Sequence, residues 1–149
     1  MTIPNFRKIN LVAYKPGRSI SNNRKKAIKL SANESALGIG KKVQKILKTF
    51  DKKISKYPDS KFKSLTNTIS KEYKCNQNQI ICGSGSDEII QMLCQLFLKR
   101  GDEVIVPQYS FLMYRIYAKI VDAKVVYSKE NNFKVSIKEI LKKVTKKTK

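Results

Sequence analysis

The sequence contains no histidine, and this absence removes whole classes of chemistry. Ser-His and Cys-His nucleophilic catalysis, imidazole general bases and most zinc sites all require that side chain. Cysteine is scarce as well, with Cys75, Cys82 and Cys94 at wide spacing and in no C-x-x-C pair. An odd number of cysteines in this arrangement is not a disulfide framework. Any chemistry must therefore use other groups or a bound cofactor.

Long apolar segments are also missing. The longest nearly apolar stretch runs from Leu93 to Leu98, is interrupted by Gln95, and is far too short to cross a bilayer. Residues 1–16 lack the apolar core that a signal peptide needs. We therefore expect a cytoplasmic protein without a membrane partner.

Acidic residues are few, so the formal net charge reaches +21. A nucleic-acid partner is the obvious hypothesis, but the sequence has 27 lysines and only five arginines, spread along the whole chain. Specific readers of nucleic acid favour the planar arginine fork. A bias toward Lys, Asn and Ile gives the same total without any function. Nucleic-acid binding remains the weakest alternative, and the lysine-rich segment 142–149 is interpreted as a solvated helix end.

The length suits one domain, and the pattern along the chain changes once. Residues 1–27 form an irregular arm punctuated by Pro4, Pro16 and Gly17. After it we expect a short strand at 28–30, an amphipathic helix over 41–50, a turn at 57–60, and a second helix from Phe62 to Tyr73.

From residue 80 onward, strands and helices alternate. The pattern predicts strands at 80–82, 103–106 and 124–127, and helices at about 86–98, 111–121 and 137–144. This alternation is typical of an α/β fold with a mainly parallel sheet and crossover helices.

The segment Gly83–Glu88 lies between a predicted strand and a predicted helix. Its glycines allow a sharp turn, and a helix start offers free N–H groups that suit a phosphate. The third glycine of a dinucleotide fingerprint is missing, and so is the Gly-Lys-Ser/Thr of a P-loop. An ordinary helix start capped by Ser84, with Asp87 and Glu88 in its first turn, explains the segment equally well.

Tyr109 follows the next predicted strand, within Pro107–Ser110. An aromatic ring at the carboxyl end of a parallel strand can stack on a flat cofactor, although a core tyrosine is the simpler interpretation. A phosphate anchor and a stacking ring on adjacent strands together describe a cofactor pocket.

Several segments, in order and at family spacing over residues 10–140, resemble the motifs of histidinol-phosphate aminotransferases, which depend on pyridoxal phosphate. The matching segments are Tyr14–Gly17, Leu30–Gly38, Lys56–Asp59, Gly83–Ile90, Gly101–Val104 and Pro107–Tyr114. The resemblance implies that residues 28–149 are the first part of the large domain of a fold-type I transferase that uses this cofactor.

The resemblance also implies roles for individual residues. Gly85, Ser86 and Asp87 would hold the phosphate of pyridoxal 5'-phosphate, and Tyr109 would stack on its ring. Tyr57 would reach the phosphate in a partner subunit, which implies a homodimer.

Two further residues, Tyr14 and Asn33, would line the side of the substrates, which are an amino donor and an oxo acceptor. Without the resemblance, Tyr14 is equally well a mobile-arm aromatic, Tyr57 a turn residue and Asn33 a turn cap.

The family's Schiff-base lysine, in a Ser-Lys-x-x-Gly-type segment, is expected further along than residue 149. The Ser-Lys pairs of this chain lack that context; they begin at Ser55, Ser60, Ser70 and Ser128. The ring-nitrogen aspartate and the carboxylate-binding arginine are expected downstream too. We therefore expect an N-terminal portion that is inactive alone. A non-catalytic α/β module that keeps a phosphate pocket remains an alternative, and relatives that act on other amino acids share these motifs.

Overall fold

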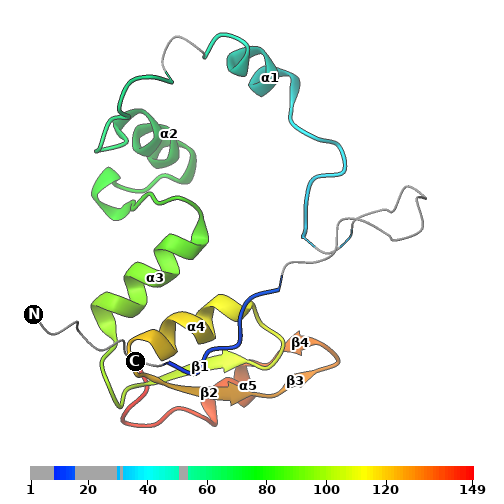
Figure 1. Ribbon diagram of the computed structural model, residues 1–149, viewed down its shortest axis with the longest axis vertical. Helices are drawn as coiled ribbons and strands as arrows, with labels where there is room; N and C mark the ends of the chain where they lie inside the picture. The colour runs from blue at the N-terminus through cyan, green and yellow to red at the C-terminus, as the bar shows by residue number, and fades with distance from the viewer. Residues whose placement is uncertain (1–8, 16–29, 31, 51–53) are drawn as a thin grey trace, which may run out of the picture. The chain divides into compact units, whose positions relative to one another are not determined.

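The computed structural model describes residues 9–15, 30, 32–50 and 54–149 (Figure 1). The chain divides into two compact units, one of residues 15–80 and the other of residues 1–14 with 81–149. Each unit is described by itself. The predicted boundary of the N-terminal arm at residue 27, and most of the strand predicted at 28–30, lie outside the described residues, so both stay predictions.

The unit of residues 15–80 contains both predicted helices, α1 (Lys41–Leu47) and α2 (Lys63–Tyr73), and a short 3-10 helix, η2 (Gln77–Gln79). Helix α1 ends three residues before the predicted end at Phe50. The reason is local, because the hydroxyl of Thr49 donates to the carbonyl of Ile46 at 2.9 Å, and the Thr49 N–H donates to the same carbonyl at 3.0 Å. The backbone thus closes a tighter turn in place of another helical one.

Asp59 organises the start of α2. Its two carboxylate oxygens accept the backbone N–H groups of Lys61 and Lys63, each at 3.0 Å. These two bonds lower the pKa of the Asp59 carboxyl below its ordinary value. The Phe62 N–H donates to the Asp59 carbonyl at 3.0 Å, so the turn spans residues 59–62 and is displaced from the predicted 57–60.

The second unit is built around a strand-helix-strand motif. β1 (Glu103–Pro107) and β2 (Lys124–Ser128) pair in parallel, with Glu103 opposite Lys124 and Pro107 opposite Ser128. Helix α4 (Leu112–Ile120) is the crossover and packs on both strands, as Figure 1 shows. The predicted parallel sheet with a crossover helix is therefore confirmed.

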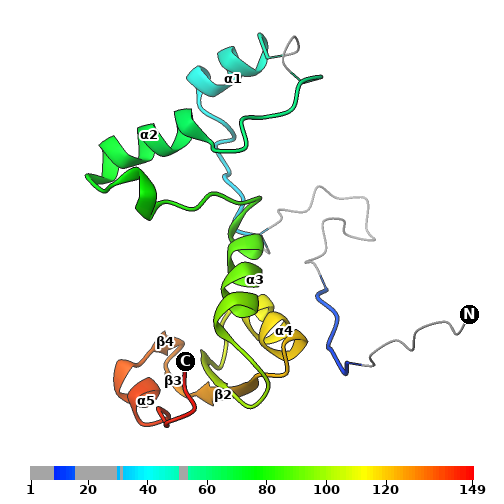
Figure 2. The same cartoon turned by 90° about the vertical axis from the view of Figure 1, so that its left-hand side faces the viewer.

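Helix α3 (Ser86–Phe97) precedes β1 and packs beside α4 (Figure 2). Small and apolar side chains fill the interior of this unit. The buried apolar residues are Cys94, Val106, Ala118 and Ala123. Burial of this kind is what fixes the strands and helices relative to one another within the unit.

The strand predicted at Ile80–Cys82 is wrong. Ile80 has extended backbone angles, but residues 80–82 pair with no strand in the part of the chain that the structure describes, and Ile81 is exposed. An apolar run supplies only a preference for extended backbone, whereas a strand also needs a neighbour for its N–H and C=O groups.

A hairpin that the sequence did not predict follows β2. Its strands are β3 (Glu130–Asn131) and β4 (Lys134–Val135), which pair antiparallel. The two turn residues, Asn132 and Phe133, have φ angles of 49° and 59°. Left-handed angles at both central positions indicate a type I′ turn, for which Asn132 is a usual residue and Phe133 is not.

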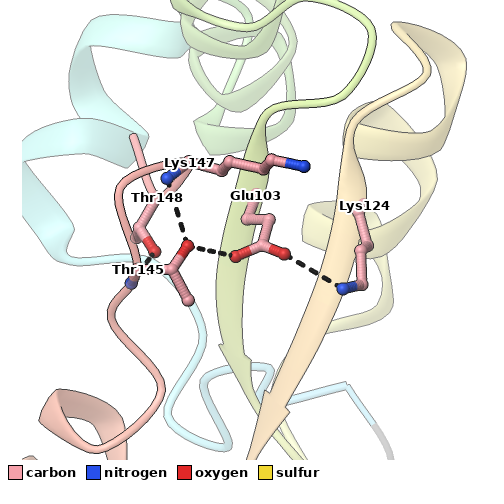
Figure 3. Close-up of polar contacts among 5 residues, drawn as sticks. All are labelled: Glu103, Lys124, Thr145, Lys147 and Thr148. Atoms are coloured by element: carbon pink, nitrogen blue, oxygen red, sulfur yellow. Dashed lines mark hydrogen bonds and ion pairs between the residues drawn. The ribbon is translucent and has the colours of Figure 1, made fainter.

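The C-terminal residues differ from the predicted helix end. Helix α5 (Ile137–Leu141) stops before the predicted Val144, and Thr148 bridges to Glu103 in parallel. The Glu103 N–H donates to the Lys147 carbonyl at 2.8 Å, and the Lys149 N–H donates to the Glu103 carbonyl at 3.1 Å. Figure 3 shows this segment on the side of β1 that faces away from β2. Residues 147–149 therefore pair with β1 through an isolated parallel bridge, on the edge opposite to β2.

The described ranges contain no helix that is both long and apolar enough to cross a bilayer.

Candidate cofactor and substrate site

The loop Gly83–Ser86 ends at the first turn of α3. Gly85 is the residue before the helix and has a φ angle of 87°, which side chains other than glycine rarely adopt. Apart from Gly85 and its two chain neighbours, no described residue has an atom within 4 Å of the position that a Cβ at Gly85 would take. The backbone at this point is therefore open to close approach by a ligand.

The first turn of α3 offers hydrogen-bond donors. Within the described part of the chain, the backbone N–H groups of Ser86, Asp87 and Glu88 donate to no protein acceptor. In the alternative interpretation Ser84 caps the helix, but the residue before the helix is Gly85 and no side-chain capping bond is made; Asp87 and Glu88 do lie in the first turn, as that interpretation expects. Free N–H groups at the positive end of a 12-residue helix are the arrangement that binds phosphate groups.

Glu88 folds back onto the loop. Its carboxylate accepts the backbone N–H of Ser84 and is therefore hydrogen-bonded within the loop. The same side chain and Ile89 crowd Gly83, where a Cβ would lie 2.9 Å from Ile89 Cδ1 and 3.0 Å from Glu88 Oε2. A Cβ at Gly83 would therefore make the flexible ends of these two side chains shift, whereas Gly85 is constrained by its own backbone angle.

Tyr109 lies between β1 and α4, and 62% of it is exposed. Its backbone N–H donates to Glu130 Oε1 at 3.1 Å, and its ring centroid lies 5.3 Å from that of Phe133. The β3–β4 hairpin therefore holds the Tyr109 segment in place. A core tyrosine, the simpler interpretation of the sequence, does not describe this exposed ring.

The structure brings Tyr14 to the same connection. Its ring meets that of Phe111 edge to face, with centroids 6.2 Å apart. Phe111 is two residues beyond Tyr109 and directly precedes α4. No hydrogen bond or ring contact between described residues joins this group to the loop Gly83–Ser86.

The remaining predicted residues, Asn33 and Tyr57, belong to the unit of residues 15–80. Asn33 has a φ angle of 50°, a backbone conformation that asparagine tolerates better than most residues. Tyr57 is fully exposed and lines a cavity of about 510 Å³ with Phe50, Ile54, Lys56 and Pro58. Tyr57 makes no hydrogen bond or ring contact with the described residues of its unit, so its side chain is accessible to another surface.

Sequence reasoning missed Phe133 and Glu130, which position Tyr109. Asn132 was the available signal, because asparagine favours the left-handed angle of a hairpin turn. The described residues contain no group of acidic residues and cysteines that could hold a metal ion.

Comparison with known proteins decides the family. A model of the aminotransferase class I and II family matches residues 25–149. The chain belongs to this family. The predicted relationship, drawn from the segments around Asn33, Gly85 and Tyr109, is thereby confirmed.

Among aminotransferases of known sequence, the histidinol-phosphate aminotransferase of Pelagibacter ubique is 66% identical over 149 residues. The match covers all of this chain and 41% of that protein. The enzyme of the same name from Maricaulis maris is 34% identical over 133 residues, which are 89% of this chain and 37% of that protein. The chain thus spans about two fifths of the length of these relatives.

Solved aminotransferase structures agree with the fold. The histidinol-phosphate aminotransferase of Clostridium acetobutylicum has a TM-score of 0.63 at 27% identity, covering 76% of this chain and 33% of that one. The enzyme of the same name from Sinorhizobium meliloti, solved with pyridoxal-5'-phosphate, has a TM-score of 0.71 at 17% identity. The match covers 74% of this chain and 30% of that one. The predicted first part of an aminotransferase large domain is confirmed as the fold.

Proposed function

We propose that this chain is the N-terminal part of a histidinol-phosphate aminotransferase that uses pyridoxal 5'-phosphate and serves histidine biosynthesis. Such an enzyme transfers an amino group between an amino donor and an oxo acceptor. The observation that carries the proposal is the 66% identity, over the whole chain, to a protein of that name.

The loop before α3 fits the phosphate of this cofactor. Ser86, Asp87 and Glu88 present backbone N–H groups without protein acceptors, and the hydroxyl of Ser86 is exposed beside them. Gly85 leaves the approach open. The positive end of the helix dipole adds attraction for a phosphate dianion. We assign phosphate binding to Gly85, Ser86 and Asp87.

Tyr109 supplies a ring for one face of the cofactor. When bound, the pyridine ring of the cofactor acts as an electron sink for the amino-group transfer. Offset stacking of Tyr109 would hold that ring in a fixed plane, while Glu130 binds the Tyr109 backbone N–H and Phe133 contacts its ring.

Tyr57, Tyr14 and Asn33 complete the proposed site. The full exposure of Tyr57 supports a role toward the cofactor phosphate of a partner subunit in a homodimer. The contact of Tyr14 with Phe111 brings its half-exposed ring near the segment of Tyr109, which supports a role on the substrate side. Asn33 is assigned to the substrate side by its place in the motif Leu30–Gly38.

No lysine of the 149 residues lies in the sequence context of the family's cofactor-binding lysine. We therefore expect that the chain by itself, mixed with pyridoxal phosphate and reduced with borohydride, yields only scattered low-level lysine adducts in peptide mapping. One dominant, stoichiometric modified lysine would contradict this assignment.

The proposed activity can be tested in a hybrid. Residues 1–149 would be joined to the part of the Pelagibacter ubique relative that follows the matched region, and the hybrid assayed for amino transfer from histidinol phosphate to an oxo acid. We expect cofactor retention and activity on histidinol phosphate above that on aromatic amino acids. The reverse preference would refute the substrate, and a hybrid that folds but retains no cofactor would refute the cofactor site.

A further inference from the structure

A second cavity lies apart from the loop Gly83–Glu88, in the unit of residues 81–149. Its volume is about 480 Å³. Gln108 follows β1 and Ser128 ends β2, so the cavity lies at the carboxyl ends of the two parallel strands, where α/β sheets bind their ligands. The lining residues are Gln108, Arg115, Tyr127, Ser128, Lys129 and Lys143.

Two of the lining residues each carry a buried polar atom that has no hydrogen-bond partner among the residues that the structure describes. The Ser128 side chain belongs to a residue that is only 1% exposed, and its Oγ makes no hydrogen bond. The Nε of Arg115 is buried and makes none either. Buried polar groups are nearly always paired in folded proteins, so two in the wall of one cavity indicate a missing polar partner.

The rest of the Arg115 guanidinium is already held in place. Its Nη2 donates to the Ser110 carbonyl at 3.2 Å, and its central carbon lies 5.8 Å from the centroid of the Tyr127 ring. The Ser110 hydroxyl in turn donates to the Pro107 carbonyl at 2.8 Å, which fixes that loop. A fixed guanidinium with a free Nε–H is a donor oriented in advance.

The charge of the cavity wall determines the class of ligand. Arg115, Lys129 and Lys143 are cationic, and no carboxylate lines the cavity. The nearest acidic neighbour in sequence, Glu130, accepts the backbone N–H of Tyr109. Three positive charges and two free donors disfavour a cation or an apolar ligand, and they match an oxyanion.

We propose that this cavity binds an oxyanion group of a small molecule, a phosphate or a carboxylate. The Arg115 Nε–H and the Ser128 O–H donate hydrogen bonds to its oxygens, and Lys129 and Lys143 supply charge. The site shares no residue with the loop that we assign to the cofactor phosphate. It adds a second anion site at the carboxyl ends of β1 and β2, next to the segment that carries Tyr109.

A footprint of the arginines tests the proposal on the 149-residue chain. Arg115 and Arg100 would be modified with phenylglyoxal in the presence of inorganic phosphate, acetate or chloride at equal ionic strength. Peptide mapping would then measure the rate of modification of each arginine. Arg100 is exposed and lies outside the cavity, so it reports general ion effects. We expect phosphate or acetate, relative to chloride, to slow modification of Arg115 and leave Arg100 unchanged. Protection by phosphate alone would identify the ligand as a phosphate, and protection by both would identify a general oxyanion site.

Two variants separate this site from the general positive charge of the chain. Ser128→Ala removes the buried donor, and we expect about tenfold weaker protection of Arg115, the usual loss for a hydrogen bond to a charged group. Lys143→Met, at an exposed position that cannot disturb the sheet, should weaken protection less. Lys138→Met, at an exposed lysine outside the cavity, is the matched control and should leave protection unchanged. An Arg115 rate that neither anion alters, or that falls in step with Arg100, would overturn the proposal.

Discussion

The two units of this chain differ in what stabilises them. In residues 81–149, side chains from β1, α4 and β2 are buried against one another, as with Val106 and Ala118. Among the described residues of the unit 15–80, Thr66 is the one buried residue. Its hydroxyl donates to the carbonyls of Phe62 and Lys63 within the same helix. One unit is stabilised by tertiary packing and the other mainly by local hydrogen bonds.

The apolar faces of the helices make the same point. The sequence predicts an inward face on α1, and that face is exposed in the structure at Val43, Ile46, Leu47 and Phe50. An amphipathic pattern establishes that a face prefers burial but does not say which surface will cover it. Isolated helices of 7 and 11 residues are marginal in water, so α1 and α2 need burial that the described residues of their own unit do not supply.

Amide hydrogen exchange would show the largest difference between the units. We expect amides of β1, α4 and β2 to exchange at least tenfold more slowly than those of α1 and α2, because opening the first set disrupts a packed core. Measurement of exchange by mass spectrometry, peptide by peptide, resolves the two units. Equal protection in both units would show that α1 and α2 are buried as firmly as β1, α4 and β2, and would contradict the contrast.

The same substitution in both units gives the next largest contrast. Val106 is 2% exposed and Val43 is 49% exposed. Val106→Ala should lower the free energy of unfolding by about 2 kcal/mol, through lost burial and a cavity. Val43→Ala should change it by less than about 0.5 kcal/mol, because a half-exposed helix position loses little. Urea unfolding followed by circular dichroism measures both, and similar losses would contradict the contrast.

The sequence predicted those elements whose patterns are self-contained. The helices α1 to α4 and the strands β1 and β2 were predicted within a few residues, because their apolar spacing and flanking breakers lie within each segment. The missing strand at Ile80–Cys82 and the parallel bridge between Glu103 and Thr148 depend on partners distant in sequence. Periodicity within one segment cannot report such pairing.

The candidate site shows the same limit. Gly85 and its neighbours could be predicted from a local strand-loop-helix pattern, and their free N–H groups agree with it. The contact of Tyr14 with Phe111, and that of Tyr109 with Phe133, bring together residues far apart in the sequence. No local pattern indicates such contacts, and only the turn residue Asn132 hinted at the hairpin.

Substitutions in the proposed cofactor site test its function, and they are made in the hybrid protein described under the proposed function. Gly85→Val should weaken cofactor retention most, because a β-branched residue at a φ angle of 87° strains the turn and blocks the approach. Tyr109→Ala should cost on the order of 1 kcal/mol beyond the lost contact area. Tyr127→Phe keeps its ring and should retain the cofactor. Cofactor dissociation followed by absorbance measures all three, and unchanged retention in Tyr109→Ala would show that the ring assignment is wrong.

The smallest expected effect is a difference in acid sensitivity, and it depends on one carboxylate in each unit. Glu103 accepts the Thr145 hydroxyl at 2.6 Å and pairs with Lys124 at 3.0 Å, as Figure 3 shows. These contacts, the Thr145 bond first, lower the pKa of Glu103 below its ordinary value of 4.5. In the other unit, the backbone bonds from Lys61 and Lys63 lower the pKa of Asp59 below 3.8.

A carboxyl whose pKa is lower in the folded state stabilises that state above its ordinary pKa and loses this contribution as the pH falls through the lowered value. Below about pH 4.5, exchange in β1 and the segment 145–149 should therefore accelerate, and the Glu103→Gln variant should lack that component. Acceleration at the start of α2 should begin at lower pH, because the ordinary pKa of Asp59 is lower, and should disappear in Asp59→Asn. Exchange rates corrected for the intrinsic pH dependence of amides provide the measurement. If Glu103→Gln alters the acid response of α2 as much as that of β1, the two units unfold together and the distinction between them fails.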